Sequence, residues 1–194
     1  RADPADGAGE MMFEIRLSTG TGRALFDVAG LRVPVGDAPP RAPQGEPVVT
    51  PSGWVYGTTE FGGVVDVASQ PEGYGVVFRF HRDDPEHPEV VVRFGADGRV
   101  DDPARVMAGL VLDGDGLAGT SYGGGVSGWG TLFRIGPATH TLEVLHSFGA
   151  RDSTGLRLSF GLRPGAPLVR TQGGALFGVA GEGLQNRGAI FRFD

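Results

Sequence analysis

The chain contains no cysteine and no lysine, and the absence of cysteine excludes several kinds of site. Without cysteine there can be no disulfide, no thiolate zinc site and no cysteine nucleophile. All 17 cationic residues are arginine, against 23 acidic residues, and the formal net charge is −6. The arginines form no basic block. An acidic chain without a basic patch argues against nucleic acid as a partner.

Long hydrophobic runs are also missing from the sequence. No apolar stretch approaches the roughly 18 residues that a membrane helix needs, so we expect no membrane span. The first residues, RADPADGAGE, do not resemble a signal peptide. We interpret residues 1–11 as a flexible N-terminal segment, of the kind that a mature secreted chain carries.

Glycine and proline, in contrast, are abundant, with 35 and 14 residues among 194. Such a content predicts many turns, and the glycines follow no collagen period. Helical periodicity is almost absent, apart from residues 101–107, where one helical turn would fit. The composition therefore predicts an all-β protein with short strands.

A repeat of about 60 residues is the clearest feature of the chain. Three similar segments, GWVYGTTEFGG, DGLAGTSYGGG and GALFGVAGEG, align on Gly57, Gly119 and Gly178. These glycines are 62 and 59 residues apart. Recurrence at such a period is typical of stacked repeats and propellers.

A second shared segment follows each of these glycines. The sequences GVVFRF, GTLFRI and GAIFRF align on Phe78, Phe133 and Phe191, which are 55 and 58 residues apart. The N-terminal sequence MFEIRL aligns with the same segment, because Phe13 precedes Phe133 by 120 residues, or two periods. The chain therefore begins with half a unit.

The unit is predicted to contain four antiparallel strands joined by glycine-rich turns. Residues 12–194 form one repeat domain in this interpretation. It contains a partial unit at 12–40, full units at 46–100 and 108–155, and a partial unit at 166–194.

Four-stranded units in tandem predict a β-propeller-like array of about 3.5 blades. A single blade cannot bury both of its faces, so we expect consecutive units to stack on one another. Propellers typically close with about 4 to 8 blades. Because this chain falls short of that number, either it associates with other protein subunits, as a homo-oligomer or within a larger assembly, or it is a fragment of a longer array. We favour association.

Residues 47–194, and more weakly 12–30, resemble the GloVer tandem repeat of bacterial extracellular proteins. The stretch GLVLDGDGLAGTSYGGG, with the later GTLFRI and VLHSF, carries the resemblance. The third unit departs from it, with FGVAGEG in place of the usual YGTT-type segment. The resemblance implies secretion or surface display and a propeller-like array. It implies no activity and no catalytic residue.

Two groups of side chains are weak candidates for a metal site. Asp113 and Asp115, in DGDG, resemble part of a calcium loop, but the third ligand and the distant glutamate are missing, and a hairpin turn explains them better. His81 and His87 lie among acidic residues in a segment that we expect to be a loop. A solvated loop explains this second group better, so we predict no metal and no cofactor.

Four aromatic residues are the best ligand candidates, because they lie at repeat-equivalent tips: Phe61, Tyr74, Tyr122 and Trp129. Such tips could stack on sugar rings, and packing between units or a protein interface would explain them equally well. Glu60 shares a repeat position with Tyr122, and Glu182 lies near the third equivalent, so no acid pair recurs.

The glycine-rich stretch 123–130 lies between two predicted strands and opens no helix, so it does not indicate a phosphate loop. No nucleophile motif appears either. The sequence therefore predicts a noncatalytic extracellular or cell-surface module, or a periplasmic one, that acts as a structural or assembly subunit or a protein-binding scaffold. The alternative is a glycan-binding or carbohydrate-active enzyme module that uses one end of the propeller, with a polysaccharide as partner.

Overall fold

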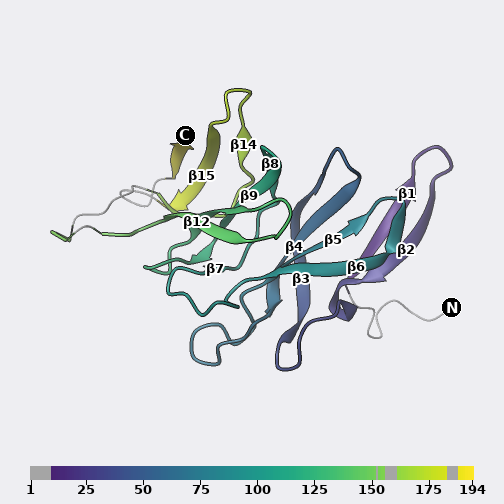
Figure 1. Ribbon diagram of the computed structural model, residues 1–194, viewed down its shortest axis with the longest axis horizontal. Helices are drawn as coiled ribbons and strands as arrows, with labels where there is room; N and C mark the ends of the chain where they lie inside the picture. Colours follow the sequence, from purple (N-terminus) through teal and green to yellow (C-terminus); the bar gives the residue numbers. More distant parts are fainter. Residues whose placement is uncertain (1–9, 152, 156–160, 183–187) are drawn as a thin grey trace.

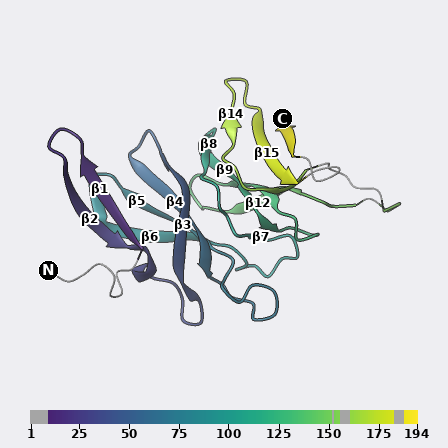
Figure 2. The same ribbon diagram turned by 180° about the vertical axis from the view of Figure 1, so that it is seen from behind.

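The computed structural model describes residues 10–151, 153–155, 161–182 and 188–194. Within these residues the chain is almost entirely β-structure, with one short 3-10 helix, η1 (Val28–Gly30). Three four-stranded antiparallel sheets follow one another along the longest axis of the molecule, and an N-terminal hairpin precedes them (Figures 1 and 2). The all-β prediction is confirmed.

The strands follow the chain in simple order within each full sheet. The hairpin consists of β1 (Met11–Arg16) and β2 (Thr21–Asp27), and the first sheet of β3 (Ala38–Val49), β4 (Trp54–Gly63), β5 (Val76–His81) and β6 (Asp84–Arg93). The second sheet contains β8 (Val111–Asp113), β9 (Gly116–Ser121), β11 (Thr131–Ile135) and β12 (Leu142–Ser147). In the third sheet, β13 (Leu162–Pro164), β14 (Val169–Arg170) and β16 (Ala189–Phe193) all pair with β15 (Leu176–Glu182). A two-stranded ladder joins β7 (Pro103–Ala104) to β10 (Gly123–Gly124).

The strand register matches the sequence repeat. Gly119 pairs with Phe133 in the second sheet, as Gly57 pairs with Phe78 in the first sheet. The third sheet repeats this pairing. A Cβ on Gly119 would lie 2.7 Å from the Phe133 ring, so only glycine lets the ring lie flat against the strand.

The N-terminal hairpin has the structure of the third and fourth strands of a unit. A register shift interrupts β1–β2, β5–β6 and β11–β12 just before Phe13, Phe78 and Phe133 respectively. The bulge lies at the same place in three hairpins, so the local backbone structure recurs within the chain. The alignment of the N-terminus with the repeat is therefore supported by the backbone.

The hydrophobic core lies between consecutive sheets, because the first and second sheets are each buried on both faces. Phe78 and Phe80 of β5 pack toward the hairpin, whereas Val77 packs toward the second sheet. The second sheet alternates in the same way, with Phe133 toward the first sheet and Leu132 toward the third sheet. Stacking of the units is thus what removes their apolar side chains from water.

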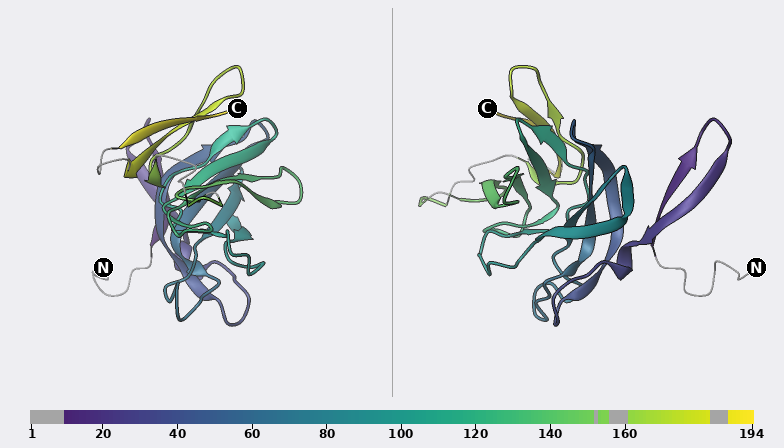
Figure 3. Two further views of the ribbon diagram at one scale, coloured as in Figure 1. Left: turned by 90° about the vertical axis from the view of Figure 1, so that its left-hand side faces the viewer. Right: turned by 45° about the vertical axis from the view of Figure 1, so that its right-hand side comes forward.

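The tip of the hairpin stands away from the other strands (Figure 3), whereas its base packs against the first sheet through Phe26. Phe13 is 60% exposed, although its equivalent Phe78 is 1% exposed. The difference arises because Phe78 has β4 beside it, whereas β1 pairs with β2 alone. Among the described residues, no helix has the length and hydropathy of a membrane span.

The contact between Gly119 and Phe133 leads to a stability prediction. In Gly119→Ala, the new methyl group would overlap both Phe133 and Leu110, each 2.7 Å from the ideal Cβ position. Phe133 is fully buried and has no room to move. We expect a loss of about 1–3 kcal/mol in the free energy of unfolding, measured by urea denaturation.

Gly136→Ala is the matched control in the same sheet, because its Cβ would come no closer than 3.7 Å to another atom. The urea denaturation midpoint of Gly136→Ala should stay close to that of the wild-type protein. Equal midpoints for both variants would contradict the packing argument.

Candidate functional site

The four aromatic residues predicted as ligand candidates lie at the turns and strand ends where the stacked sheets meet. Phe61 lies near the end of β4, Tyr122 directly follows β9, and Trp129 precedes β11. Tyr74 precedes β5 and lines the same cavity as Tyr122. All four side chains are partly buried rather than exposed.

Arginine side chains connect three of these rings. The Arg105 guanidinium lies 5.7 Å from the Phe61 ring centre and 5.2 Å from that of Tyr122. Arg163 lies 5.1 Å from Tyr122 and 4.7 Å from Trp129. These five residues form what we call the arginine–aromatic ladder. Cation–π contacts of this kind contribute about 0.5–1 kcal/mol each at partly exposed sites.

Arg105 and Arg163 occupy equivalent positions in consecutive units. Both have left-handed backbone conformations, with φ of 59° and 54°. Their backbone N–H groups bond to the carbonyl oxygens of Tyr74 and Trp129, at 3.1 and 2.7 Å. The equivalent residue of the first sheet, Ala42, has φ of 53° but no such side chain. A left-handed conformation is uncommon for residues other than glycine, so its recurrence at all three positions is a feature of the repeat backbone, which carries an arginine at two of them.

Each of these arginines reaches back to the preceding unit. Arg105 donates to one carboxylate oxygen of Glu60 through Nε at 2.9 Å and Nη2 at 2.6 Å. Arg163 donates to the Tyr122 hydroxyl at 2.9 Å and lies 3.3 Å from Glu182. Glu60 and Tyr122 share a repeat position, so the two contacts are equivalent. Both hold consecutive sheets together and orient the guanidinium groups.

A cavity of about 380 Å³ opens beside the ladder. Three arginines, Arg99, Arg105 and Arg163, line it together with Tyr74 and Tyr122. The lining thus brings three guanidinium groups together, although each of them is also paired with a carboxylate: Asp101, Glu60 and Glu182 respectively. Arginine offers several N–H donors in a planar arrangement that fits phosphate or carboxylate groups.

Asp102 is the one carboxylate that lines this cavity in the described part of the chain. The residue is 5% exposed, and its Oδ2 accepts the backbone N–H of Arg99 at 2.9 Å. Burial raises the pKa of Asp102 above its usual value, although the hydrogen bond from Arg99 opposes the shift. The backbone carbonyl oxygen of Asp102 accepts the N–H of Gly125. This bond ties Asp102 to the glycine-rich turn at residues 123–125, which we call the glycine turn.

The sequence reasoning identified the aromatic residues but missed Arg99, Asp102, Arg105 and Arg163. One signal was available, because Arg105 and Arg163 are 58 residues apart, which is close to one repeat. The glycine-rich stretch 123–130 also contributes to the cavity, although it was not expected to form a binding loop. Asp102 carried no sequence signal, since its burial depends on packing.

The aspartates of the DGDG turn lie away from this cavity. Asp113 is buried and bonded to two guanidinium groups, with Arg134 Nε at 2.7 Å and Arg170 Nε at 2.9 Å. Burial alone would raise the pKa of Asp113, but the bonds from Arg170 and Arg134 outweigh it and lower the pKa. Asp115 is exposed on the turn. Asp113 therefore joins the second and third sheets.

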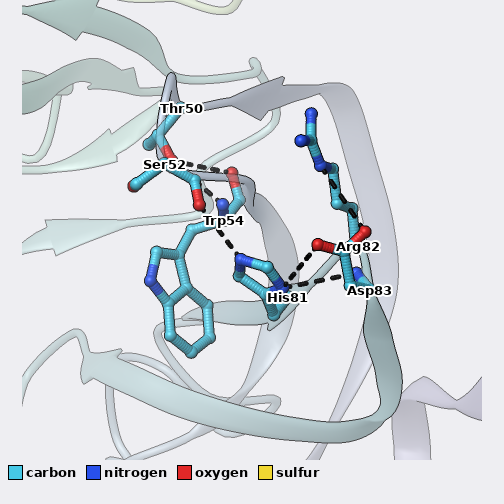
Figure 4. A network of polar contacts seen from close by, with 6 residues as sticks. All are labelled: Thr50, Ser52, Trp54, His81, Arg82 and Asp83. Carbon is cyan, nitrogen blue, oxygen red and sulfur yellow. Dashed lines mark hydrogen bonds and ion pairs between the residues drawn. The ribbon is translucent and has the colours of Figure 1, made fainter.

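The segment that holds His81 and His87 is a tight hairpin rather than the expected loop, because β6 begins at Asp84. His81 lies against the Trp54 ring, and its Nε2 is 3.0 Å from the Ser52 carbonyl oxygen (Figure 4). His87 is exposed and bonds to Asp84 at 2.7 Å.

The Nδ1 atom of His81 accepts the backbone N–H of Asp83 at 3.3 Å. The imidazole therefore carries its proton on Nε2, which donates to Ser52, and both ring nitrogens are engaged. In the described residues, no three histidine, aspartate or glutamate side chains are grouped as metal ligands.

No known protein family matches the chain by sequence, and no curated protein matches it. Among solved structures, it is similar to a Bacteroides fragilis protein described provisionally as a 6-phosphogluconolactonase. The TM-score is 0.51 at 16% identity, and the match covers 98% of this chain and 46% of that chain. The likeness concerns the fold. This chain spans about half the length of the structure that it matches.

The comparison corrects one prediction from the sequence. A noncatalytic structural, assembly or scaffold module was expected, and this expectation is wrong, because the structural neighbour is described as an enzyme. In the described residues nothing supports an assembly role. The sequence reasoning failed here because strand patterns and turns report the architecture and not the side chains that gather at its cavities.

The bonds of Asp113 to Arg134 and Arg170 lead to a pH-dependent prediction. In Asp113→Asn we expect a loss of about 1–2 kcal/mol in the free energy of unfolding at pH 7, given that both arginines are partly exposed. The folded pKa of Asp113 lies below its ordinary value of 3.8. Its stabilising effect is therefore complete above that value and disappears as the pH falls through the folded pKa.

Denaturation midpoints at pH 7 and pH 3 would measure this difference, which should be larger at pH 7. Asp115→Asn, on the same turn, is the control and should change stability by less than about 0.5 kcal/mol at either pH. A constant effect of Asp113→Asn over this range would contradict the ionic explanation.

Proposed function

We propose that this chain forms part of an enzyme that binds a small anionic sugar derivative in the arginine-lined cavity and hydrolyses an ester bond within it. The observation that carries the proposal is the convergence of Arg99, Arg105 and Arg163 with Tyr74 and Tyr122 on one cavity. A concave site with a few converging polar groups is the usual form of a small-molecule site.

The arginines account for an anionic group on the ligand. Arg105 uses Nε and Nη2 for Glu60, and Arg99 uses Nε and Nη2 for Asp101. In each case the described bonds leave Nη1 of the guanidinium group for a ligand. A phosphate or carboxylate group would therefore complete the coordination of two fixed cations without breaking an existing ion pair.

The remaining lining residues suit a sugar. Tyr74 and Tyr122 present aromatic rings of the kind that stack on pyranose faces. Ser69 and Gln70 add a hydroxyl and an amide, which can exchange hydrogen bonds with sugar hydroxyl groups. The volume of about 380 Å³ lies in the range of small-molecule sites.

The structural neighbour supplies the class of reaction. Its name, 6-phosphogluconolactonase, describes hydrolysis of the internal ester of a phosphorylated sugar acid. A substrate of this class carries both an anionic group and an ester carbonyl, which matches a cavity with arginines and a carboxylate. The likeness covers 46% of that protein, so the proposal concerns the binding cavity formed by this chain.

The fold is also proposed to be propeller-like. Three stacked four-stranded sheets, a 60-residue repeat and cores between consecutive sheets support this interpretation. The resemblance to the GloVer repeat, the extracellular or periplasmic location, the association with other subunits and the polysaccharide partner stay predictions.

Ligand binding would test the proposal directly. We expect the protein to bind 6-phosphogluconate in isothermal titration calorimetry, and gluconate more weakly, because gluconate lacks the phosphate. Arg99→Gln should weaken 6-phosphogluconate binding about tenfold, since it removes one charge-assisted hydrogen-bonding group from the cavity.

Arg192→Gln is a matched control. Arg192 donates to Asp194, two residues away, as Arg99 donates to Asp101, but it lies outside this cavity. The affinity of Arg192→Gln for 6-phosphogluconate should equal that of the wild-type protein. The proposal fails if the wild-type protein does not bind 6-phosphogluconate at millimolar concentration, or if both variants lose affinity equally.

A further inference from the structure

Asp102 differs from the other carboxylates around the cavity. Asp101 accepts two bonds from Arg99, both at 3.0 Å, and Glu60 is bonded to Arg105. The carboxylate of Asp102 has no ion-pair partner in the described part of the chain. Its one side-chain bond there is to the backbone N–H of Arg99. Burying a carboxylate without a paired cation costs free energy, and carboxylates of this kind cluster at functional sites.

We propose that Asp102 is the group that accepts a proton from the attacking water in the arginine-lined cavity, an inference that rests on the proposed function. The carboxylate has a free lone pair for this purpose, since Oδ2 accepts from Arg99 and the described residues give Oδ1 no bond. General-base assistance of this kind accelerates hydrolysis by about 10²–10⁴-fold.

The reaction balances without any further reagent. Water adds through its oxygen to the ester carbonyl carbon while one of its protons passes to Asp102. The tetrahedral oxyanion then collapses, the bond from the carbonyl carbon to the ring oxygen breaks, and the proton on Asp102 passes to that oxygen. The product is a hydroxy acid, which releases its carboxyl proton to the solvent.

The cavity supports both parts of this reaction. Burial raises the pKa of Asp102, which makes it a stronger base than a surface aspartate. Arg163 lines the same cavity, and its described hydrogen bond to Tyr122 uses only Nη1, so its guanidinium group would stabilise the developing oxyanion. The charged groups around Asp102 are Arg99, Asp97 and Asp101 on its own loop, and Arg105 and Arg163 across the cavity.

The backbone holds Asp102 against the glycine turn. Its carbonyl oxygen accepts the Gly125 N–H at 3.0 Å, and the next residue, Pro103, pairs with Gly124. Gly124 has φ of 75°, and a Cβ at this position would overlap the Asp102 carbonyl oxygen. The turn therefore requires glycine at this position in order to approach the aspartate closely.

Asp102→Asn tests the inference with the δ-lactone of 6-phosphogluconate as substrate, after subtraction of its spontaneous hydrolysis. We expect kcat to fall by at least about 100-fold, with KM changed less than about threefold. In the wild-type protein kcat/KM should fall as the pH drops through the pKa of Asp102, and the variant should lack this acidic limb. Asp115→Asn, at an exposed aspartate away from the cavity, is the control and should keep wild-type kinetics.

Folding of the variant is checked separately. Asparagine can still accept the Arg99 N–H, so the loop bond is kept. The raised folded pKa means that ionised Asp102 lowers stability, and this cost grows as the pH rises through its pKa. The melting temperature of Asp102→Asn at pH 7 should therefore equal or exceed that of the wild-type protein. If the melting temperature of Asp102→Asn is lower than that of the wild-type protein, Asp102→Glu is used as the test variant instead. We expect the acidic limb of its kcat/KM profile to be shifted in pH.

The outcomes separate this inference from the proposed function. Calorimetric binding of 6-phosphogluconate by wild-type protein and Asp102→Asn alike, together with the loss of kcat, supports both. Wild-type hydrolysis that survives in Asp102→Asn overturns the role of Asp102 alone. Binding without any wild-type hydrolysis overturns the catalytic part and leaves a binding site. Absence of both binding and hydrolysis overturns both proposals.

Discussion

In each sheet the ring of a phenylalanine lies flat over the glycine that pairs with it on the neighbouring strand. The rest of the structure depends on this contact. The pairs Gly57–Phe78 and Gly119–Phe133 place the phenylalanine ring where a Cβ would otherwise sit. The ring can therefore lie close over its own sheet and still contact side chains of the neighbouring layer. The sheets can then pack closely, with a continuous core between them.

Close stacking also explains where the candidate site lies. Arg105 precedes the second sheet and reaches Glu60 of the first, and Arg163 of the third sheet reaches Tyr122, which follows β9 of the second. Each contact therefore crosses a boundary between units. The cavity is built at such boundaries, so a single unit has no complete site. Their left-handed backbone conformations direct both arginines toward the preceding unit.

The charges of the molecule divide into paired and unpaired groups. Asp113 holds two sheets together through two arginines, and its carboxylate is fully engaged. Asp102 is equally buried but bonds only to a backbone N–H within the described residues. Ion pairs of the first kind serve packing between units. A solitary carboxylate beside several guanidinium groups is better suited to proton transfer.

The sequence by itself determined the all-β class, the 60-residue period, the alignment of the N-terminal hairpin and the recurrence of Gly119 and Phe133 in each unit, but not that these two residues pair. These features are local, because strand pattern and turn chemistry act within a few residues and recur in each unit. Only the tertiary structure decided that Arg105, Arg163 and Asp102 share one cavity. Their meeting depends on how sheets stack across unit boundaries, and a backbone hydrogen bond from Gly125 holds Asp102 against residues that follow it by more than 20 positions in the sequence.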